Sequence, residues 1–361
     1  MKDFKELFNK KKVVIFGHTG FKGSWLTLWL VSLGAKVIGV SKNIPTKPSN
    51  FIACNLKKKV KNIFLNIKDF KKIKNIIIKY KPDYVFHLAA QSLVRKSYTD
   101  PLDTWQTNLL GTVNILESLK YLKNKCTVVI VTSDKSYKNI EVKRGYKESD
   151  LLGGADPYSA SKGATEFAIQ SYIKSYFNNK NNKIFIAVGR AGNVIGGGDW
   201  SADRLVPDCI KCWSKNKTVV IRNHNSTRPW QHVLEAISGY LTLASKLRKN
   251  KKLHGEVFNF GPSNKNNFRV LDLIKNFKKK WSSVKWKLNK NKFFKEANLL
   301  KLNSNKAKTK LKWKSVLSFN EIINFTIEWY KSYYFKNKNM KNYSLEQINK
   351  FNKIFRNRLI K

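Results

Sequence analysis

Acidic residues are scarce in this chain. Of its 361 residues, 23 are Asp or Glu and 71 are Lys or Arg, which gives a formal net charge of +48. A charge of this size could attract a nucleic acid or an acidic membrane. The lysines are spread along the whole sequence, however, and they occur together with abundant Asn, Ile and Phe. A general compositional bias explains this spread better than a binding stripe does, so we expect no specific nucleic-acid partner.

Cysteines and long apolar runs are also few. Cys209 and Cys212, two of the four cysteines, have the spacing of a metal-binding or redox pair, but no second pair accompanies them and they lie in an apolar helical pattern. We therefore expect reduced cysteines and no metal site. No stretch is long and apolar enough to span a membrane, and the N-terminus lacks the apolar core of a signal peptide. These absences predict a cytoplasmic protein without a membrane partner.

Short apolar runs alternate with helical patterns through the first half of the sequence. This alternation favours an α/β fold with a doubly wound parallel sheet, the Rossmann arrangement. Strands are expected at residues 11–16, 36–40, 60–65, 84–88, 128–132 and 184–189, and a late one at 257–260. Helices are expected at residues 24–33, 97–122, 159–177, 205–213, 270–281 and 320–334, and the basic tail from 336 to 361 has some helical periodicity.

The pattern of the sequence changes after residue 190, which suggests two domains. Residues 1–190 would form a dinucleotide-binding domain that also receives later segments near 228–262. Residues 191–361 would form mainly a smaller, interleaved α/β domain for the substrate.

Three glycines follow the first expected strand. In a strand–turn–helix setting the first permits a tight turn, the second lets the backbone approach a pyrophosphate, and the third allows close packing of helix on strand. The pattern G-x-x-G-x-x-G therefore predicts dinucleotide binding by this turn, through Gly17, Thr19, Gly20, Phe21, Lys22 and Gly23.

The ends of two further strands complete the predicted cofactor site. An acidic residue at the end of the second strand would hold a ribose hydroxyl, but Ser41 and Lys42 stand there. The choice between NAD and NADP is therefore open at this point. Small residues after the fourth strand would let a flat ligand approach, so we expect cofactor contacts from Ser41, Leu88, Ala89 and Ala90.

The apolar run at residues 128–131 stops abruptly in polar groups. This is the pattern of a buried parallel strand that delivers polar side chains at its C-terminal edge. The groups delivered are those of Thr132, Ser133, Asp134 and Lys135. Hydroxyl, carboxyl and ammonium groups in succession indicate acid/base chemistry rather than packing.

A helix start follows at residues 156–162. Asp156 can cap the helix, Pro157 suits its first position, and Tyr158 and Lys162 then lie four residues apart on one face. A phenol beside an ammonium, facing the polar strand end, predicts a catalytic set. Its members are Thr132, Asp134, Lys135, Tyr158 and Lys162.

Candidate substrate contacts lie mostly after residue 190. Residues 191–200 form a glycine-rich loop without helical period, and such a loop can curl around a ligand. Arg228 and Trp230 stand close together in a short extended segment, where a guanidinium suits a phosphate and an indole suits a base or sugar face. The expected substrate contacts are Gln91, Ser133, Asn193, Arg204, Arg228 and Trp230.

Three motifs stand in register with the extended short-chain dehydrogenase/reductase superfamily. They are the glycine turn at 17–23, H-L-A-A-Q at 87–91 and Y-x-x-x-K at 158–162. Within this superfamily the chain resembles the CDP-glucose 4,6-dehydratase family over nearly its whole length. The resemblance is carried by G-H-T-G-F-K-G-S-W-L at 17–26, V-T-S-D-K-S-Y at 131–137, D-P-Y-S-A-S-K-G at 156–163, G-R-A-G-N-V-I-G-G-G-D-W at 189–200, D-R-L-V-P-D at 203–208 and R-P-W-Q-H-V at 228–233. The chain departs from many relatives at Ser41-Lys42 and Asn66, where an acid is common.

The resemblance implies a reaction in which NAD is a recycled hydride carrier. Tyr158, with a pKa lowered by Lys162 and the cationic nicotinamide, would take the proton of the sugar 4-hydroxyl, while Thr132 would orient that hydroxyl. Tyr158 and Lys162 would also contact the cofactor, and Lys162 would hold the nicotinamide ribose. Lys135 would remove the C5 proton and Asp134 would protonate the departing 6-hydroxyl. The cofactor would end as it began, so the enzyme would be a lyase that converts CDP-D-glucose to CDP-4-dehydro-6-deoxy-D-glucose and water.

The resemblance also implies a biological setting and an assembly. The setting would be deoxysugar synthesis for lipopolysaccharide O-antigen. Relatives commonly pair through two helices per subunit, here residues 97–122 and 159–177. We therefore expect a homodimer or a dimer-based homotetramer.

Two alternatives compete with this interpretation. The chain could be a 4,6-dehydratase or 4-epimerase of a dTDP-, GDP- or UDP-linked sugar. An epimerase needs no acid/base pair for C5 and C6, so Asp134 and Lys135 argue against it. The chain could also be a binding protein on a dehydrogenase scaffold that holds nucleic acid through its charge. The intact set of polar residues at the strand end and helix start argues against that.

Overall fold

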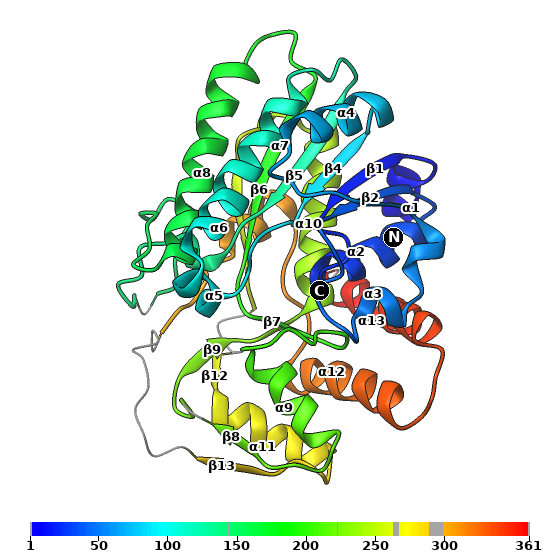
Figure 1. Cartoon of the computed structure of the whole chain (residues 1–361), viewed down its shortest axis with the longest axis vertical. Helices are drawn as coiled ribbons and strands as arrows, with labels where there is room; N and C mark the ends of the chain where they lie inside the picture. Colours follow the sequence, from blue (N-terminus) through cyan, green and yellow to red (C-terminus); the bar gives the residue numbers. More distant parts are fainter. Residues whose placement is uncertain (1, 143, 222, 263–266, 289–298, 360–361) are drawn as a thin grey trace.

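A parallel sheet forms the centre of the molecule. The computed structural model describes residues 2–142, 144–221, 223–262, 267–288 and 299–359, and within them the main sheet has seven strands in the order β11-β6-β5-β4-β1-β2-β3 (Figure 1). All neighbouring strands in it run parallel. The strands are β1 Lys12–Phe16, β2 Lys36–Ser41, β3 Lys61–Phe64, β4 Tyr84–His87, β5 Cys126–Val131, β6 Ile184–Ala191 and β11 Val257–Phe260. The predicted doubly wound α/β fold is confirmed.

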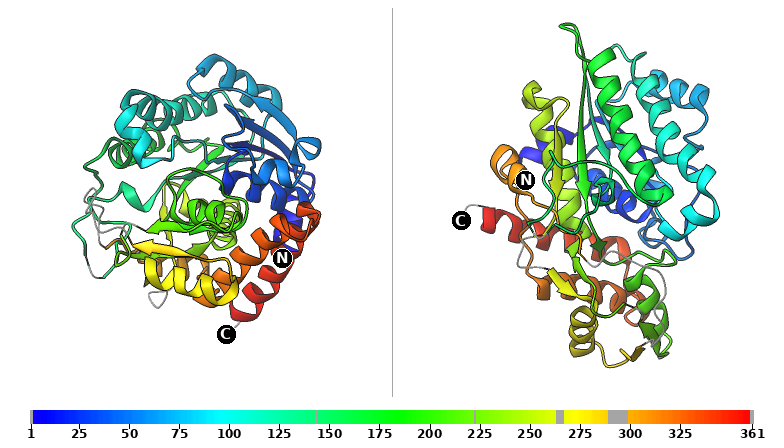
Figure 2. Two further views of the ribbon diagram at one scale, coloured as in Figure 1. Left: turned by 60° about the horizontal axis from the view of Figure 1, so that its bottom comes forward. Right: turned by 90° about the vertical axis from the view of Figure 1, so that its left-hand side faces the viewer.

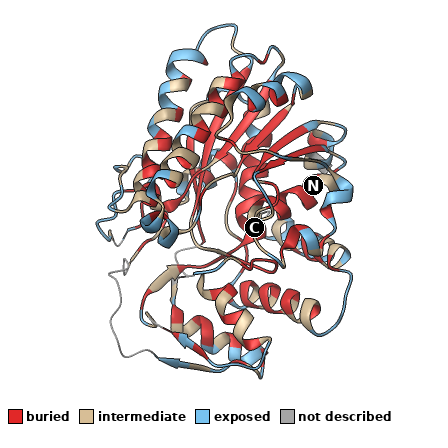
Figure 3. Cartoon of the chain, in the orientation of Figure 1, coloured by how far each residue is buried: buried red, intermediate tan, exposed pale blue. Residues whose placement is uncertain are grey.

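Helices cover both faces of this sheet. One face packs on α4 Phe70–Tyr80, α7 Gly111–Leu119 and α8 Pro157–Tyr176, and the other packs on α2 Phe21–Ser32 and α10 Val233–Lys249 (Figures 1 and 2). Burial on both sides explains why the central strands are continuously apolar rather than alternating. Figure 3 shows the buried residues concentrated on the sheet and on the helix faces turned toward it.

The strand order reverses between β1 and β4. The chain passes from β1 outward to β2 and β3, and then returns to the other side of β1 for β4 and β5. Loops at the carboxyl ends of β1 and β4 therefore leave in opposite directions, and this is where doubly wound sheets bind ligands. The glycine turn follows β1 and the Leu88–Gln91 segment follows β4, so the sheet topology brings the two predicted cofactor segments together.

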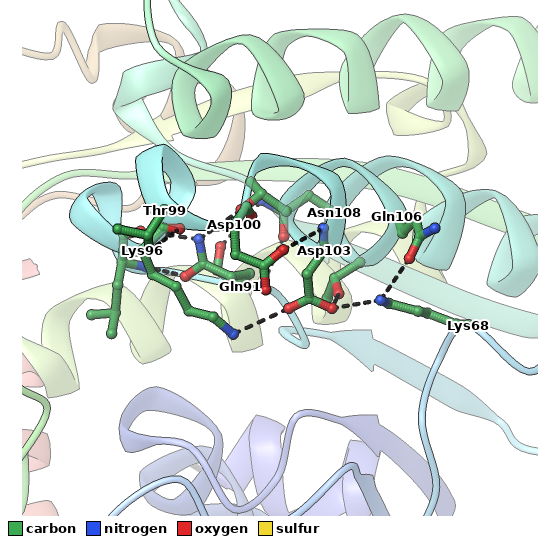
Figure 4. A network of polar contacts seen from close by, with 11 residues as sticks. Lys68, Gln91, Lys96, Thr99, Asp100, Asp103, Gln106 and Asn108 are labelled. Atoms are coloured by element: carbon green, nitrogen blue, oxygen red, sulfur yellow. Dashed lines mark hydrogen bonds and ion pairs between the residues drawn. The ribbon is translucent and has the colours of Figure 1, made fainter.

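The predicted helix at 97–122 is interrupted. It consists of α5 Val94–Thr99, α6 Pro101–Trp105, a wide turn at Gln106–Leu110 and α7. Asp100 leaves the helical conformation and its carboxylate accepts the Asp103 N–H at 3.1 Å, while Pro101 has no N–H to continue the preceding helix. In Figure 4 the Asp103 carboxylate lies between Lys68 and Lys96, at 2.5 and 3.1 Å.

The second half of the chain builds a smaller part below the carboxyl ends of the strands and then returns to the sheet (Figure 1). Its strands are paired as β10–β7, β12–β9 and β13–β8. The remaining elements are β7 Val194–Ile195, α9 Leu205–Trp213, β8 Val219–Ile221, β9 Thr227–Pro229, β10 Gln231–His232, β12 Asn267–Arg269, α11 Val270–Lys280, β13 Trp286–Leu288, α12 Phe319–Tyr334 and α13 Met340–Leu359, with short helical turns α3 Asn50–Ala53, Leu56–Lys59, Asp134–Ser136, Lys251–Leu253 and Ala307–Leu311 elsewhere. The domain boundaries predicted at residues 190 and 228–262 remain a proposal.

The first and last helices, α1 and α13, pack against the core. The N-terminal helix α1 Lys2–Phe8 buries Phe8 against Tyr84. The basic tail forms α13, whose Phe351 packs edge-on against Trp29 of α2. Nearly all of α10 is buried, and its return to the sheet allows β11 to pair with β6.

Two predicted absences can be compared with the described residues. All four cysteines there are unpaired thiols, with Cys209 and Cys212 on α9, and these residues contain no cluster of His, Cys, Asp and Glu suited to a metal ion. No helix within them combines the length and apolarity that a membrane crossing needs.

Candidate active site

The glycine turn after β1 is shaped for close backbone contact. Gly17 has φ +91°, and a Cβ there would lie 2.6 Å from the backbone nitrogen of Ala89. A Cβ on Gly23 would lie 1.9 Å from the Gly17 carbonyl oxygen. Helix α2 starts at Phe21, three residues earlier than predicted, and no side chain caps its first N–H groups. The free N–H groups and the helix dipole make this turn suitable for a pyrophosphate.

The end of β2 is braced by a buried polar network. The Ser41 hydroxyl accepts from the Thr19 N–H at 3.3 Å and lies 2.9 Å from Nδ1 of His18, while Nε2 of His18 lies 2.5 Å from Asn62. The Thr19 hydroxyl donates to the Asn43 carbonyl at 2.7 Å. These contacts hold the loop that follows β2. Direct contacts of Ser41 and Thr19 with a cofactor stay predictions.

The segment after β4 is also fixed by hydrogen bonds of Gln91. Gln91 donates its N–H to the Asn108 side chain at 2.9 Å, and its own amide nitrogen donates to the Leu93 carbonyl and the Thr104 hydroxyl, each at 3.0 Å (Figure 4). Leu88, Ala89 and Ala90 precede it, and the Ala89 backbone lies against Gly17. The Gln91 amide thus positions the loop, and its predicted contact with a substrate is untested.

The polar residues after β5 lie in a tight turn. Residues Asp134–Ser136 form a short helical turn, and the Ser133 hydroxyl accepts the Lys135 N–H at 3.2 Å. Thr132, Ser133 and Asp134 are buried, while Lys135 is partly exposed. The sequence pattern of a strand ending in reactive groups therefore has the predicted geometry.

Helix α8 begins as the sequence predicts. Asp156 accepts the N–H groups of Tyr158 and Ser159, each at 3.0 Å, and Pro157 occupies the first turn. Tyr158 and Lys162 are 7% and 6% exposed, so this pair is not a solvated surface pair. The start of α8 packs on the turn that carries Asp134.

Burial shifts the pKa values of the acid/base groups of this site. It raises the pKa of the Tyr158 phenol, and the Asp134 charge adds to this, whereas the Ser133 hydrogen bond and the Arg204 charge oppose it. Burial lowers the pKa of Lys162 to about 8. The lowered Tyr158 pKa that the resemblance implies is thus not a property of the chain by itself.

Asp134 carries a buried oxygen without a partner. Its Oδ1 accepts from the Ser133 hydroxyl at 3.0 Å, and its Oδ2 has no hydrogen bond within the described chain. A Cβ on Gly192 would lie 2.9 Å from Oδ2, so the glycine-rich loop passes directly over it. An unsatisfied buried carboxylate oxygen costs free energy, which indicates a functional group rather than a structural one.

The charge of Lys22 interacts with that of Asp134 and with those of two further cations. Burial and the charges of Arg204 and Lys162 lower the pKa of Lys22 to about 8, while Asp134 acts in the opposite direction. Arg204 pairs with Asp199 at 3.0 Å and donates to the Ser92 hydroxyl at 3.1 Å. Lys22 and Arg204 therefore lie near Asp134 and Asp199, and their predicted contacts with a cofactor and a substrate stay predictions.

The other predicted substrate residues lie in different settings. The Asn193 carbonyl accepts the Gln231 N–H at 3.2 Å, beside the loop that covers Asp134. Arg228 is on β9 and donates to the Thr227 carbonyl at 3.0 Å. Trp230 is 4% exposed and its indole N–H donates to the Phe268 carbonyl at 3.0 Å, so the described role of this ring is packing. Their contacts with a substrate stay predictions.

Comparison with known proteins gives one consistent family. A family model described as GDP-mannose 4,6 dehydratase matches residues 14–326. The chain is 42% identical over 333 residues to the CDP-glucose 4,6-dehydratase of Salmonella typhimurium, covering 91% of this chain and 93% of that protein. It is 29% identical over 264 residues to the dTDP-D-glucose 4,6-dehydratase of Dictyostelium discoideum, covering 70% of this chain and 58% of that protein.

Solved structures agree on the fold. The UDP-glucose 4-epimerase of Thermotoga maritima superimposes with a TM-score of 0.77 at 24% identity, covering 89% of this chain and 99% of that one. DesIV, a dTDP-glucose 4,6-dehydratase of Streptomyces venezuelae, superimposes with a TM-score of 0.73 at 19% identity, covering 91% and 100%. The family model over residues 14–326 and the 42% identity to the Salmonella protein show that the chain belongs to the GDP-mannose 4,6 dehydratase family.

Proposed function

We propose that this chain is a CDP-glucose 4,6-dehydratase, a lyase that converts CDP-D-glucose to CDP-4-dehydro-6-deoxy-D-glucose and water, in the cytoplasm. The observation that carries this proposal is the buried turn with Asp134 and Lys135 packed against the start of α8 with Tyr158 and Lys162. A hydroxyl-oxidising pair beside a second acid/base pair is what a dehydration at C5 and C6 needs. The 42% identity to the Salmonella enzyme supports the choice of CDP-glucose.

We further propose NAD as the cofactor. The fit rests on the turn after β1, where Gly17 and Gly23 leave room only for backbone and where the N–H groups at the start of α2 are uncapped. When bound there, the nicotinamide would supply the oxidation at C4 and the matching reduction at C6. DesIV was solved with NAD bound, which supports the same cofactor here. The residues that would hold it are Gly17, Thr19, Gly20, Phe21, Lys22, Gly23, Ser41, Leu88, Ala89, Ala90, Tyr158 and Lys162.

The residues of the chain would then act in sequence. Tyr158, as the phenolate, would accept the proton of the sugar 4-hydroxyl, and the positive charges of the Lys162 ammonium and the bound nicotinamide would lower the Tyr158 pKa so that this phenolate forms. The 4-ketone acidifies the C5 proton, which Lys135 would remove. Asp134 would give its proton to the departing 6-hydroxyl, so that this group leaves as water and a C5–C6 double bond forms. Reduction at C6 and return of a proton to C5 complete the 6-deoxy product.

The substrate can be identified with a panel of nucleotide sugars. We expect the purified protein with NAD to form a 4-keto-6-deoxy sugar from CDP-glucose, at a kcat/KM at least about tenfold above that for the dTDP-, UDP- or GDP-linked sugar. Formation is followed by the absorbance of 4-keto sugars in base, and the product is identified by its mass. A higher kcat/KM with another nucleotide sugar would contradict the CDP preference. A product with an inverted 4-hydroxyl and no loss of water would show an epimerase instead.

We also propose that two copies of the chain pair through α8 and the helices beside it, at residues 97–122 and 159–177. Four large apolar side chains are more than half exposed there: Tyr98 66%, Leu102 66%, Leu110 53% and Phe167 63%. They lie on α5, α6, the turn before α7 and α8, which pack on one another. Such a patch on one side of a molecule is typical of a protein interface.

The pairing predicts a change in mass. The wild-type protein should have about twice the chain mass of 41.8 kDa, or four times it for a dimer of dimers. Leu102→Glu combined with Phe167→Glu should yield a 41.8 kDa monomer, because two charges would have to be buried in the interface. Light scattering after size-exclusion chromatography measures this. Leu151→Glu, at a residue 74% exposed on another segment, is the control and should leave the mass unchanged.

A further inference from the structure

The Thr132 hydroxyl donates its single proton to Glu166, which lies behind the site. Its Oγ1 lies 2.6 Å from Oε1 of Glu166, and the two residues are 5% and 0% exposed. A carboxylate can only accept, so the hydroxyl must be the donor. The Thr132 oxygen therefore has only lone pairs left for the cleft. It can accept a hydrogen bond from a sugar hydroxyl or from the Tyr158 phenol, but it cannot donate one to a sugar ketone.

Glu166 is held in place by Arg190 on β6. The guanidinium Nε donates to Oε1 at 2.8 Å and Nη2 donates to Oε2, with the two side chains 2% and 1% exposed. Arg190 in turn packs against the Tyr137 ring, with 4.5 Å from its central carbon to the ring centroid. A two-point ion pair of this kind fixes a carboxylate in one orientation.

Glu166 also acts on Lys162. The two residues are one turn apart on α8, and Glu166 is the neighbour whose charge favours the ammonium form of Lys162 against burial. The other groups that interact with Lys162 are Lys22 of α2, which repels it, and His87 of β4, whose pKa burial lowers to about 3, so that its ring is neutral. Without Glu166, the buried ammonium would keep no nearby anion among these groups.

We propose that Glu166, held by Arg190, is a positioning residue of the active site: it commits the Thr132 hydroxyl to accept hydrogen bonds from the cleft, and it keeps Lys162 charged. This inference rests on the proposed role of Tyr158 and Lys162 in oxidising a sugar hydroxyl. It goes beyond that role because Glu166 is fully buried behind Thr132 and would reach neither the sugar nor the cofactor. It also specifies that Thr132 orients a sugar hydroxyl by accepting its hydrogen bond.

The pH profile of turnover separates this role from a merely structural one. Glu166→Gln removes the anion, so the pKa of Lys162 should fall further below about 8 and the basic limb of the kcat profile should move to lower pH by about one unit. A variant that only folds less well would lose activity equally at every pH. Glu166→Asp keeps the charge but is one methylene too short for Thr132, so it should lower kcat and leave the limb in place. Ser118→Ala removes a buried hydroxyl that donates to the Asn114 carbonyl within α7 at 2.7 Å, away from Glu166, and should change neither.

A second variant and a second measurement keep the test decisive. Glu166→Gln leaves the Arg190 guanidinium buried without its partner, and if it does not fold, the double variant Glu166→Gln/Arg190→Met removes both charges and should fold. The kcat profile is measured with whichever nucleotide sugar turns over. Independently of turnover, the pH dependence of Lys162 labelling by a small amine reagent, followed by mass spectrometry, gives the pKa of this amine. An unmoved Lys162 pKa in the folded variants would overturn the proposal whatever the substrate proves to be.

Discussion

Replacing Tyr158 with Phe should lower turnover of the nucleotide sugar by about 10²–10⁴-fold and leave the fold intact. The phenol oxygen is the proposed acceptor of the 4-hydroxyl proton, and no other described side chain at the start of α8 can take that place. The ring is 7% exposed and packs at the start of α8, and Phe conserves that packing. The initial rate of 4-keto sugar formation at saturating NAD and substrate measures the loss.

The comparison for this prediction is Tyr80→Phe. Tyr80 ends α4 four residues before β4 begins, so it lies at the amino ends of the strands, opposite the cleft, and the same loss of a hydroxyl should leave the rate within about twofold. Equal melting temperatures of both variants would show that the rate, not the folded fraction, has changed. Full activity of Tyr158→Phe would remove the phenol from the mechanism and, with it, the proposed role of Lys162.

The sheet could be predicted from the sequence because its signals are local. Each central strand is a short apolar run, and each crossover helix begins or ends at a residue with clear backbone preferences. The break at Asp100-Pro101 carries such a signal too, an Asp cap before a proline, although a continuous helix was expected there. Helix α10 shows no alternation of apolar and polar faces in the sequence, because it is buried almost all round. Its Gly239 lies so close to Phe260 that a Cβ there would be 2.4 Å from the Phe260 ring.

The site also contains residues that could be predicted from the sequence and residues that could not. Thr132, Asp134, Tyr158 and Lys162 come together as predicted, since a strand end and a helix start determine their directions. The partners behind them could not be derived from spacing, because Glu166 meets Arg190 only when α8 packs on β6. A signal for Glu166 exists, however: it is four residues after Lys162 and thus on the same helix face.

Trp230 shows that a residue type typical of ligand contacts can also be buried in the core. An indole next to an arginine suggests a ligand surface, but the ring is buried and its N–H donates to the Phe268 carbonyl. A large aromatic side chain gains more free energy from burial than from a partly solvated contact, so packing competes with any functional role. Residue type alone does not decide between the two.

Asp134→Asn should block the loss of water while leaving earlier steps in place, with a fall of about 10²–10⁴-fold in 6-deoxy product. The amide has nearly the shape of the carboxylate and can still accept from the Ser133 hydroxyl, now at 3.0 Å from Oδ1. It has no proton to give to the 6-hydroxyl at ordinary pH. Oxidation at C4 and removal of the C5 proton by Lys135 should continue, so the recovered nucleotide sugar should carry deuterium at C5 after incubation in D₂O.

The companion variant Lys135→Met separates the two proposed roles. If Lys135 is the C5 base, this variant should lose both the dehydrated product and the deuterium exchange, whereas Asp134→Asn loses only the first. Asp83→Asn is the matched control, because Asp83 precedes β4 at the opposite end of the strands and should leave both readouts unchanged. Mass spectrometry and proton NMR of the recovered sugar measure exchange and dehydration together. Exchange that is lost in Asp134→Asn and kept in Lys135→Met would reverse the assignment, with Asp134 as the base. Oδ2 of Asp134 is buried without a hydrogen-bond partner, and burying it costs free energy that is regained only when a substrate donor or a proton binds to it. For this reason Asp134 is the group to test first.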